Sequence, residues 1–116
     1  MITISRVSSL IALLSLGACL PTLTDDNVTE VSANEFCKKH RACDSDLWKD
    51  TFQEDFEECQ DDLKRGFDTA KDVGALVGIE VDLREAKQCL QDLRSASCDD
   101  FNNDDYSTNC DDVYSF

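Results

Sequence analysis

Cys37, His40 and Cys43 carry side chains that can bind a metal or attack a substrate, and they are spaced Cys-x2-His-x2-Cys. A helix would carry all three on one face. Two chemistries fit, a zinc site and a Cys–His nucleophile. Zinc needs a fourth ligand, yet the chain has a single histidine, and a nucleophilic thiol must stay reduced. We therefore expect these cysteines to form disulfides, with His40 playing no metal or catalytic role.

The acidic tail offers oxygen ligands at the alternating spacing of a calcium-binding loop. Positions 1, 3, 5, 7, 9 and 12 of that spacing are Asp100, Asn102, Asp104, Tyr106, Thr108 and Asp111. Against calcium, Asp105 stands where the loop's sharp turn requires glycine, and Cys110 lies inside the loop. We expect a solvated loop and no bound cofactor, with calcium binding as the alternative.

Cys19 has a different chemical setting, at the end of an apolar run that starts after Arg6. The run is too short for a transmembrane helix but suits the core of a signal peptide. Its last residues, Leu16-Gly17-Ala18-Cys19, resemble the lipobox of bacterial lipoproteins, in which the cysteine receives a diacylglycerol and becomes the first mature residue. We therefore predict a signal peptide over residues 1–18 and a lipid anchor on Cys19.

The cysteine count agrees with this assignment. There are seven cysteines, and an odd number leaves one unpaired in an exported protein. With Cys19 lipidated, six remain to form three disulfides: Cys37, Cys43, Cys59, Cys89, Cys98 and Cys110. Cys37 and Cys43 lie too far apart along one helix to pair with each other. The rest of the connectivity stays open.

Charge limits the kinds of partner. The chain has 25 acidic and 11 basic side chains and a formal net charge of −14. Such a surface repels nucleic acids and anionic lipid headgroups, so we expect no nucleic-acid partner. The short basic run Lys38, Lys39 and Arg41 is most simply a solvated helix face. We expect attachment to the membrane through the lipid, and a protein partner of unknown identity.

Helical periodicity and capping signals indicate the elements that position these residues. Ser32 and Glu35 match a capping box, so we predict a tether over residues 19–31 and a first helix after Ser32. A second apolar pattern starts near Ser45 and predicts either one helix to Gly66 or a break near Asp55, a second capping signal, and residues 68–77 could continue as helix.

A third helix is predicted to begin at Asp82 and to end near residues 95–98, with Gly78 as the natural terminator of the helix before it. The tail from Asp99 onward is rich in Asp and Asn, so we expect irregular structure held by Cys98 and Cys110. No alternating strand pattern occurs. The fold class is therefore all-α, a small bundle of three to four short helices over residues 32–116, cross-linked by three disulfides.

The chain also resembles a known family in its spacing. The lipobox, Glu35-Phe36-Cys37 with Cys43 six residues later, and Cys89-Leu90 followed by Cys98-Asp99-Asp100 are similar to the six-cysteine lipoproteins of myxobacteria and related deltaproteobacteria. The chain departs from that pattern in having Glu57-Glu58 where the family has Gly-Ser before the third bridging cysteine. The resemblance implies architecture and location, and it brings no activity with it.

Together these features predict a bacterial lipoprotein, anchored at the periplasmic face or the cell surface. We expect a non-enzymatic module of the cell envelope that acts by binding or as a structural component, because no set of residues makes a complete catalytic site. The alternative is a calcium-binding envelope protein that uses the acidic tail.

Overall fold

The computed structural model describes residues 20–113 of the 116-residue chain. Three longer helices dominate it: α2 (Val28–Ala42), α3 (Phe56–Leu76) and α4 (Leu83–Ser95). One turn of π-helix, η1 (Leu47–Thr51), joins α2 to α3, and two short helices, α5 (Cys98–Asn102) and α6 (Asn109–Asp112), form the tail. The described residues contain no strand, which confirms the all-α prediction.

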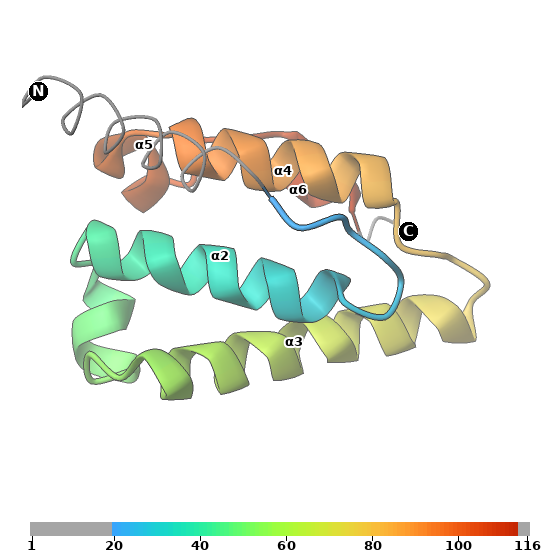
Figure 1. The fold of residues 1–116 in the computed structure, drawn as a ribbon, viewed down its shortest axis with the longest axis horizontal. Coiled ribbons are helices and arrows are strands. Elements are labelled where there is room, and N and C mark those ends of the chain that lie inside the picture. The colour runs from blue at the N-terminus through green and yellow to red at the C-terminus, as the bar shows by residue number, and fades with distance from the viewer. Residues whose placement is uncertain (1–19, 114–116) are drawn as a thin grey trace, which may run out of the picture.

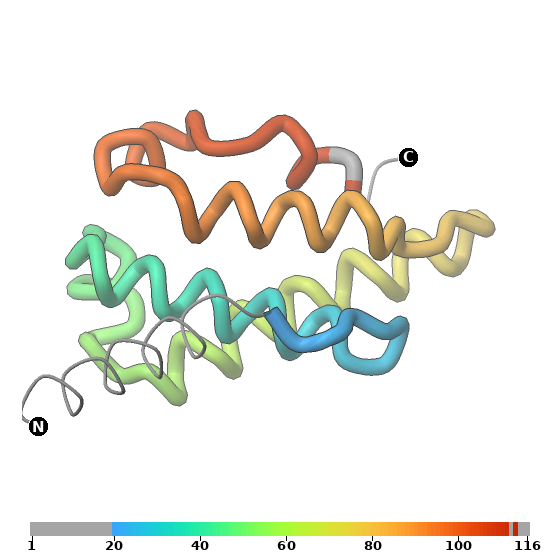
Figure 2. The backbone as a smooth tube through the Cα atoms, turned by 45° about the horizontal axis from the view of Figure 1, so that its top comes forward, coloured from blue at the N-terminus to red at the C-terminus, as the bar shows by residue number. Residues whose placement is uncertain are grey.

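Helix α2 is the centre of the bundle. It packs against α3 on one side and against α4 on the other, and α6 packs against α4 (Figure 1). The chain reverses direction between α2 and α3 and again between α3 and α4, so α2 and α4 run the same way (Figure 1). After α5 the tail returns along α4, as the tube in Figure 2 shows.

Two of the main contacts between helices, α2 with α3 and α4 with α6, each carry one disulfide. Cys37–Cys59 joins α2 to α3, and Cys89–Cys110 joins α4 to α6. Cys43–Cys98 joins the C-cap of α2 to the first residue of α5 and spans 55 residues of sequence. The six cysteines therefore form three disulfides, and Cys37 and Cys43 have different partners, as their spacing requires.

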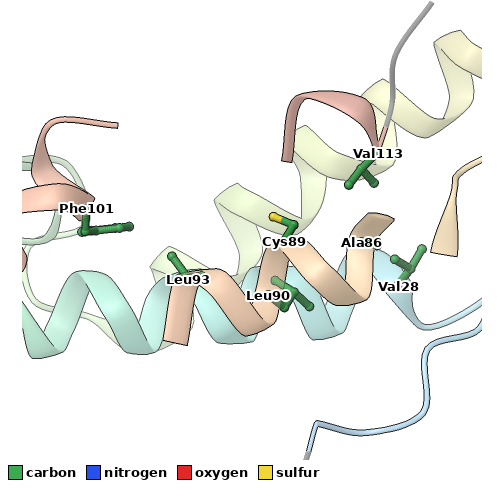
Figure 3. Close-up of a cluster of buried hydrophobic side chains, with 7 residues drawn as sticks. All are labelled: Val28, Ala86, Cys89, Leu90, Leu93, Phe101 and Val113. Atoms are coloured by element: carbon green, nitrogen blue, oxygen red, sulfur yellow. The ribbon is translucent and has the colours of Figure 1, made fainter. Parts of the chain in front are cut away.

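Two clusters of buried side chains fill the bundle. The larger lies between α2 and α4 and is closed by the tail (Figure 3), with members Val28, Ala86, Cys89, Leu90, Leu93, Phe101 and Val113. The predicted apolar face of α4 supplies most of it. The smaller cluster surrounds the first disulfide and contains Cys37, Trp48, Phe52 and Cys59. The π-helical turn therefore places Trp48 in the cluster around the disulfide that joins α2 to α3.

The predicted start of the first helix is wrong. Helix α2 begins at Val28, and its start is organised by reciprocal bonds between Thr24 and Asn27: the Thr24 amide donates to Asn27 Oδ1 at 2.8 Å, and the Asn27 amide donates to Thr24 Oγ1 at 3.2 Å. Ser32 is buried inside the helix, and Glu35 pairs with Arg94 of α4 instead of capping.

The predicted tether over residues 19–31 needs the same correction. Residues 28–31 are helical, and the side chains of Leu20 and Leu23 pack against the larger core cluster. The folded domain therefore includes the chain from Leu20 onward. The segment before it, residues 1–19, lies outside the described residues, as do residues 114–116.

The other predicted boundaries agree with the structure. A break occurs before α3, where the Asp55 carboxylate accepts a hydrogen bond from the Glu58 amide. Gly78, at φ +81°, ends α3, and the Ile79 amide bonds back to the Gly74 carbonyl. Asp82 caps α4 by accepting from the Arg84 and Glu85 amides. The tail is more regular than predicted, because Ser97 caps the short helix α5.

Candidate functional site: a pocket beside His40

In the Cys-x2-His-x2-Cys motif, both cysteines are in disulfides and only the histidine keeps its own side-chain chemistry. The sulfur atoms of Cys37 and Cys43 are bonded to those of Cys59 and Cys98. A sulfur in a disulfide is neither a thiolate ligand nor a nucleophile. A zinc site and a Cys–His nucleophile would both need a free thiolate at Cys37 or Cys43, and the disulfides leave none. The role of His40 must therefore come from its own surroundings.

His40 is a buried imidazole held by a buried serine. Its Nδ1 lies 2.7 Å from Oγ of Ser45, and the same oxygen accepts a hydrogen bond from the Trp48 amide at 3.1 Å. The Trp48 amide occupies one of the two acceptor positions of that oxygen; we assign the Ser45 hydrogen to Nδ1 and therefore the imidazole proton to Nε2. Burial lowers the pKa of His40 below its ordinary value, which keeps the ring neutral.

Ser45 is not placed as a catalytic nucleophile. Its side chain is 6% exposed, and its hydroxyl is occupied in holding the imidazole and the first turn of η1. A nucleophilic serine must present its oxygen to a substrate and have its proton removed. The His40–Ser45 pair is therefore a positioning arrangement that fixes the ring.

His40 lines a pocket of about 460 Å³. The pocket lies at the end of the bundle where α2 ends, and Figure 1 shows α5 at the same end. Its walls are of two kinds. The aromatic wall consists of Phe36, His40, Phe101 and Tyr106, and the acidic rim consists of Asp44, Asp46 and Asp104. Ser45, Leu47 and Asn102 complete the lining. We call this the His40 pocket.

The aromatic rings form a continuous wall. Phe101 lies edge-on to His40 at 4.8 Å between ring centroids and contacts Tyr106 at 5.6 Å. Tyr106 in turn meets Phe36 edge-on at 6.2 Å. Rings from α2, from α5 and from the loop after α5 are thus locked to one another, which makes the wall a preformed feature of the fold.

Two left-handed residues shape the acidic rim. Asp44 has φ +49° and Asp104 has φ +56°, and each reverses the chain just after a helix end. Lys49 approaches Asp44 and Asp46 loosely, at 3.9 and 4.0 Å. Within residues 20–113, no lysine or arginine pairs with Asp104. Its charge contributes, after burial, to raising the pKa of Tyr106 above its ordinary value.

Of the candidate calcium ligands, Asn102, Asp104 and Tyr106 line the His40 pocket. Asp100 lies in α5, Asp104 at the pocket rim, and Asp111 in α6, whose neighbour Cys110 is tied to Cys89 of α4. In the part of the chain that the structure describes, no three His, Cys, Asp or Glu side chains are grouped so as to hold a metal ion. Calcium binding by the acidic tail stays a prediction.

The basic run on α2 makes contacts within the domain. Lys39 donates to the Ala96 carbonyl, Arg41 stacks over the Phe56 ring at 4.6 Å, and Lys38 lies 3.7 Å from Glu35. These contacts favour the prediction of an ordinary helix surface. The predicted lipidation residue, Cys19, lies outside the described residues.

Most residues of the His40 pocket had no signal in the sequence. The sequence indicates Asn102, Asp104 and Tyr106 only as candidate calcium ligands, and His40 only as a zinc ligand or a base. The aromatic wall depends on contacts between residues as distant as Phe36 and Tyr106, and no local pattern indicates such a contact.

Comparison with known proteins does not place the chain in a family. No protein-family model, no curated protein and no solved structure matches it. Among the helices within residues 20–113, none combines the length and the apolar character needed to cross a membrane.

Proposed function

We propose that this chain is a lipid-anchored protein of the bacterial cell envelope, a non-enzymatic module that binds a ligand or partner outside the cytoplasm. The observation that carries the proposal is the pairing of cysteines. The six behind Cys19 are all bonded to one another, so Cys19 is the odd cysteine in the chain. It is also the residue that ends a lipobox-like sequence.

The disulfides support an exported location. Three bridges in fewer than 120 residues are typical of small domains that fold in an oxidising compartment. The resemblance to the six-cysteine lipoproteins is in line with this location. A diacylglyceryl group supplies two chains, which is what stable anchoring requires.

The packing of Leu20 determines how far the folded domain lies from a lipid on Cys19. Leu20 follows Cys19 directly and packs against the core. A lipid on Cys19 would therefore hold the domain close to the bilayer surface, with no long tether between them. The net charge of −14 disfavours further contact with anionic headgroups, so the lipid would be the main attachment.

A binding role is supported by the arrangement around His40. The pocket is concave, its aromatic wall is preformed, and its rim carries charge, as in sites that bind small molecules. The buried hydroxyl–imidazole pair that lines it is engaged in structure. A binding module is therefore favoured over an enzyme.

The proposal is tested by Cys19→Ala in the native host, followed by cell fractionation. Wild-type protein should sediment with membranes and release only with detergent. The Cys19→Ala variant should lose membrane attachment. An unchanged distribution of this variant would mean that the protein is held at the membrane by other means. A second variant, Asp61→Asn on the exposed face of α3, should fractionate like wild type.

A further inference from the structure

The His40 pocket combines two features that together select for one class of ligand. Aromatic faces attract weakly hydrated cations, and carboxylates attract any cation. The pocket presents a continuous aromatic wall and three carboxylates at its rim. A hydrated metal ion would gain little from the rings, whereas an alkylated ammonium group would use both.

His40 adds a third observation, independent of the charges. It is nine-tenths buried, and it lines the pocket. Its Nδ1 is held by Ser45, and no hydrogen bond within residues 20–113 reaches Nε2. A neutral ring whose Nδ1 accepts from a hydroxyl carries an N–H at Nε2. With the tautomer assigned above, the pocket offers one hydrogen-bond donor beside the aromatic wall.

We propose that the His40 pocket binds a small organic cation with a quaternary ammonium group and a short arm bearing an oxygen, of the choline type. The ammonium group lies against Tyr106 and Phe36 with Asp104 as its counter-charge, and the oxygen of the arm accepts a hydrogen bond from His40. The inference rests on the proposed binding role, and it is independent of the lipid on Cys19.

Asp104 is the carboxylate on which the site depends. Lys49 partly neutralises Asp44 and Asp46, at 3.9 and 4.0 Å, while no basic side chain in residues 20–113 pairs with Asp104. Asn tolerates the left-handed conformation that Asp104 adopts, at φ +56°. Asp104→Asn therefore removes the charge and keeps the turn.

Tyr106 allows the aromatic contribution to be separated from the hydroxyl. Its ring is half-buried in contact with both Phe36 and Phe101. Tyr106→Phe keeps the ring face and removes the hydroxyl, whereas Tyr106→Leu removes the ring. If a cation lies on that face, the second substitution should weaken binding more than the first.

The experiment is a calorimetric titration of the exported, disulfide-intact protein in non-ionic detergent with choline chloride. The matched probes are 3,3-dimethylbutan-1-ol, which has the same shape without the charge, and sodium chloride at equal ionic strength. We expect saturable binding of choline alone. Asp104→Asn and Tyr106→Leu should each weaken it by about fivefold or more, and Tyr106→Phe should weaken it less than Tyr106→Leu does, while Asp61→Asn leaves it within about twofold.

Three results would overturn the inference: no saturable binding of choline, equal binding of the neutral alcohol, or choline binding that Asp104→Asn and Tyr106→Leu leave unchanged. Folding of each variant is checked by its thermal transition, and Asp104→Asn, which preserves the turn, is decisive if Tyr106→Leu does not fold. Because the titration does not involve the anchor, its failure would leave the fractionation result for Cys19 unaffected.

Discussion

The Glu35 carboxylate and the Arg94 guanidinium form a two-pronged ion pair between α2 and α4, with Nε 2.7 Å from Oε1 and the second nitrogen 3.1 Å from Oε2. Glu35 is 4% exposed and Arg94 28% exposed. The planar fork of arginine matches a carboxylate in this geometry. The pair fixes the relative position of the two helices that enclose the larger core cluster.

Arg94→Met should destabilise the domain, because it leaves the buried Glu35 carboxylate without its main partner. We expect a loss of about 2–4 kcal/mol in the free energy of unfolding, near the lower end of what broken buried pairs cost because Arg94 is partly exposed. Urea unfolding followed by circular dichroism, with disulfides intact, measures it.

The matched control is Lys64→Met on α3. Lys64 pairs with Asp68 at 2.7 Å, but both side chains are well exposed, so its removal should cost about 0–1 kcal/mol. The double variant Glu35→Leu/Arg94→Met should recover much of the stability. Equal losses for Arg94→Met and Lys64→Met would show that the buried pair does not hold the helices together.

The disulfide connectivity is directly measurable. Peptide mapping of the exported protein without reductant should find Cys37–Cys59, Cys43–Cys98 and Cys89–Cys110, and thiol titration of these six should find none free. Reduction should unfold the domain or lower its melting temperature sharply, because three cross-links stabilise a small core. Any other pairing would contradict the packing described above.

Acidification should act on His40 in a defined direction. Its pKa is lowered by burial, so the unfolded chain binds a proton at His40 more readily than the folded one. The stability contributed by the neutral ring is complete above the ordinary histidine pKa of about 6.5 and is lost as the pH falls below it. His40→Gln removes this dependence.

The measurement is the difference in unfolding free energy between wild type and His40→Gln, taken from pH 8 to pH 5. Taking the difference cancels the carboxylates common to both proteins. It should shrink as the pH falls below about 6.5. A difference that grows on acidification would mean that the folded state prefers the charged imidazole, which would contradict a buried neutral ring.

Calcium and magnesium should raise the melting temperature equally, through screening of the acidic surface alone. A true calcium loop would favour calcium, because magnesium gives up its water reluctantly. Asp100→Asn combined with Asp104→Asn should therefore change neither rise more than Asp61→Asn does. A calcium-specific rise that the double variant abolishes would establish the alternative function of the acidic tail.

Local signals in the sequence predicted helix boundaries well where the capping residue acts on its own helix. Asp55 and Asp82 each accept hydrogen bonds from amides two or three residues later, so their effect is contained in a few residues. Ser32 and Glu35 have the same pattern, but Glu35 is used by Arg94, 59 residues away. A capping box and a buried ion pair look identical until the distant partner is known.

The candidate site was beyond sequence reasoning for a similar reason. Its aromatic wall joins Phe36 to Tyr106, and its rim depends on left-handed Asp44 and Asp104. Aspartate is tolerated in that conformation without requiring it, so the residue type does not indicate the turn. The number of bridging cysteines could be predicted from parity, whereas their connectivity depended on which helices pack together.

Lipidation of Cys19 is tested most directly by the intact mass of the protein purified from its native host. We expect a chain that begins at Cys19, with residues 1–18 removed and a mass increase equal to a diacylglyceryl group, with or without an additional acyl chain. Cys19→Ala should show neither the lipid nor that cleavage. A mature protein with an unmodified Cys19, or one that retains residues 1–18 without lipid, would contradict the proposed anchor.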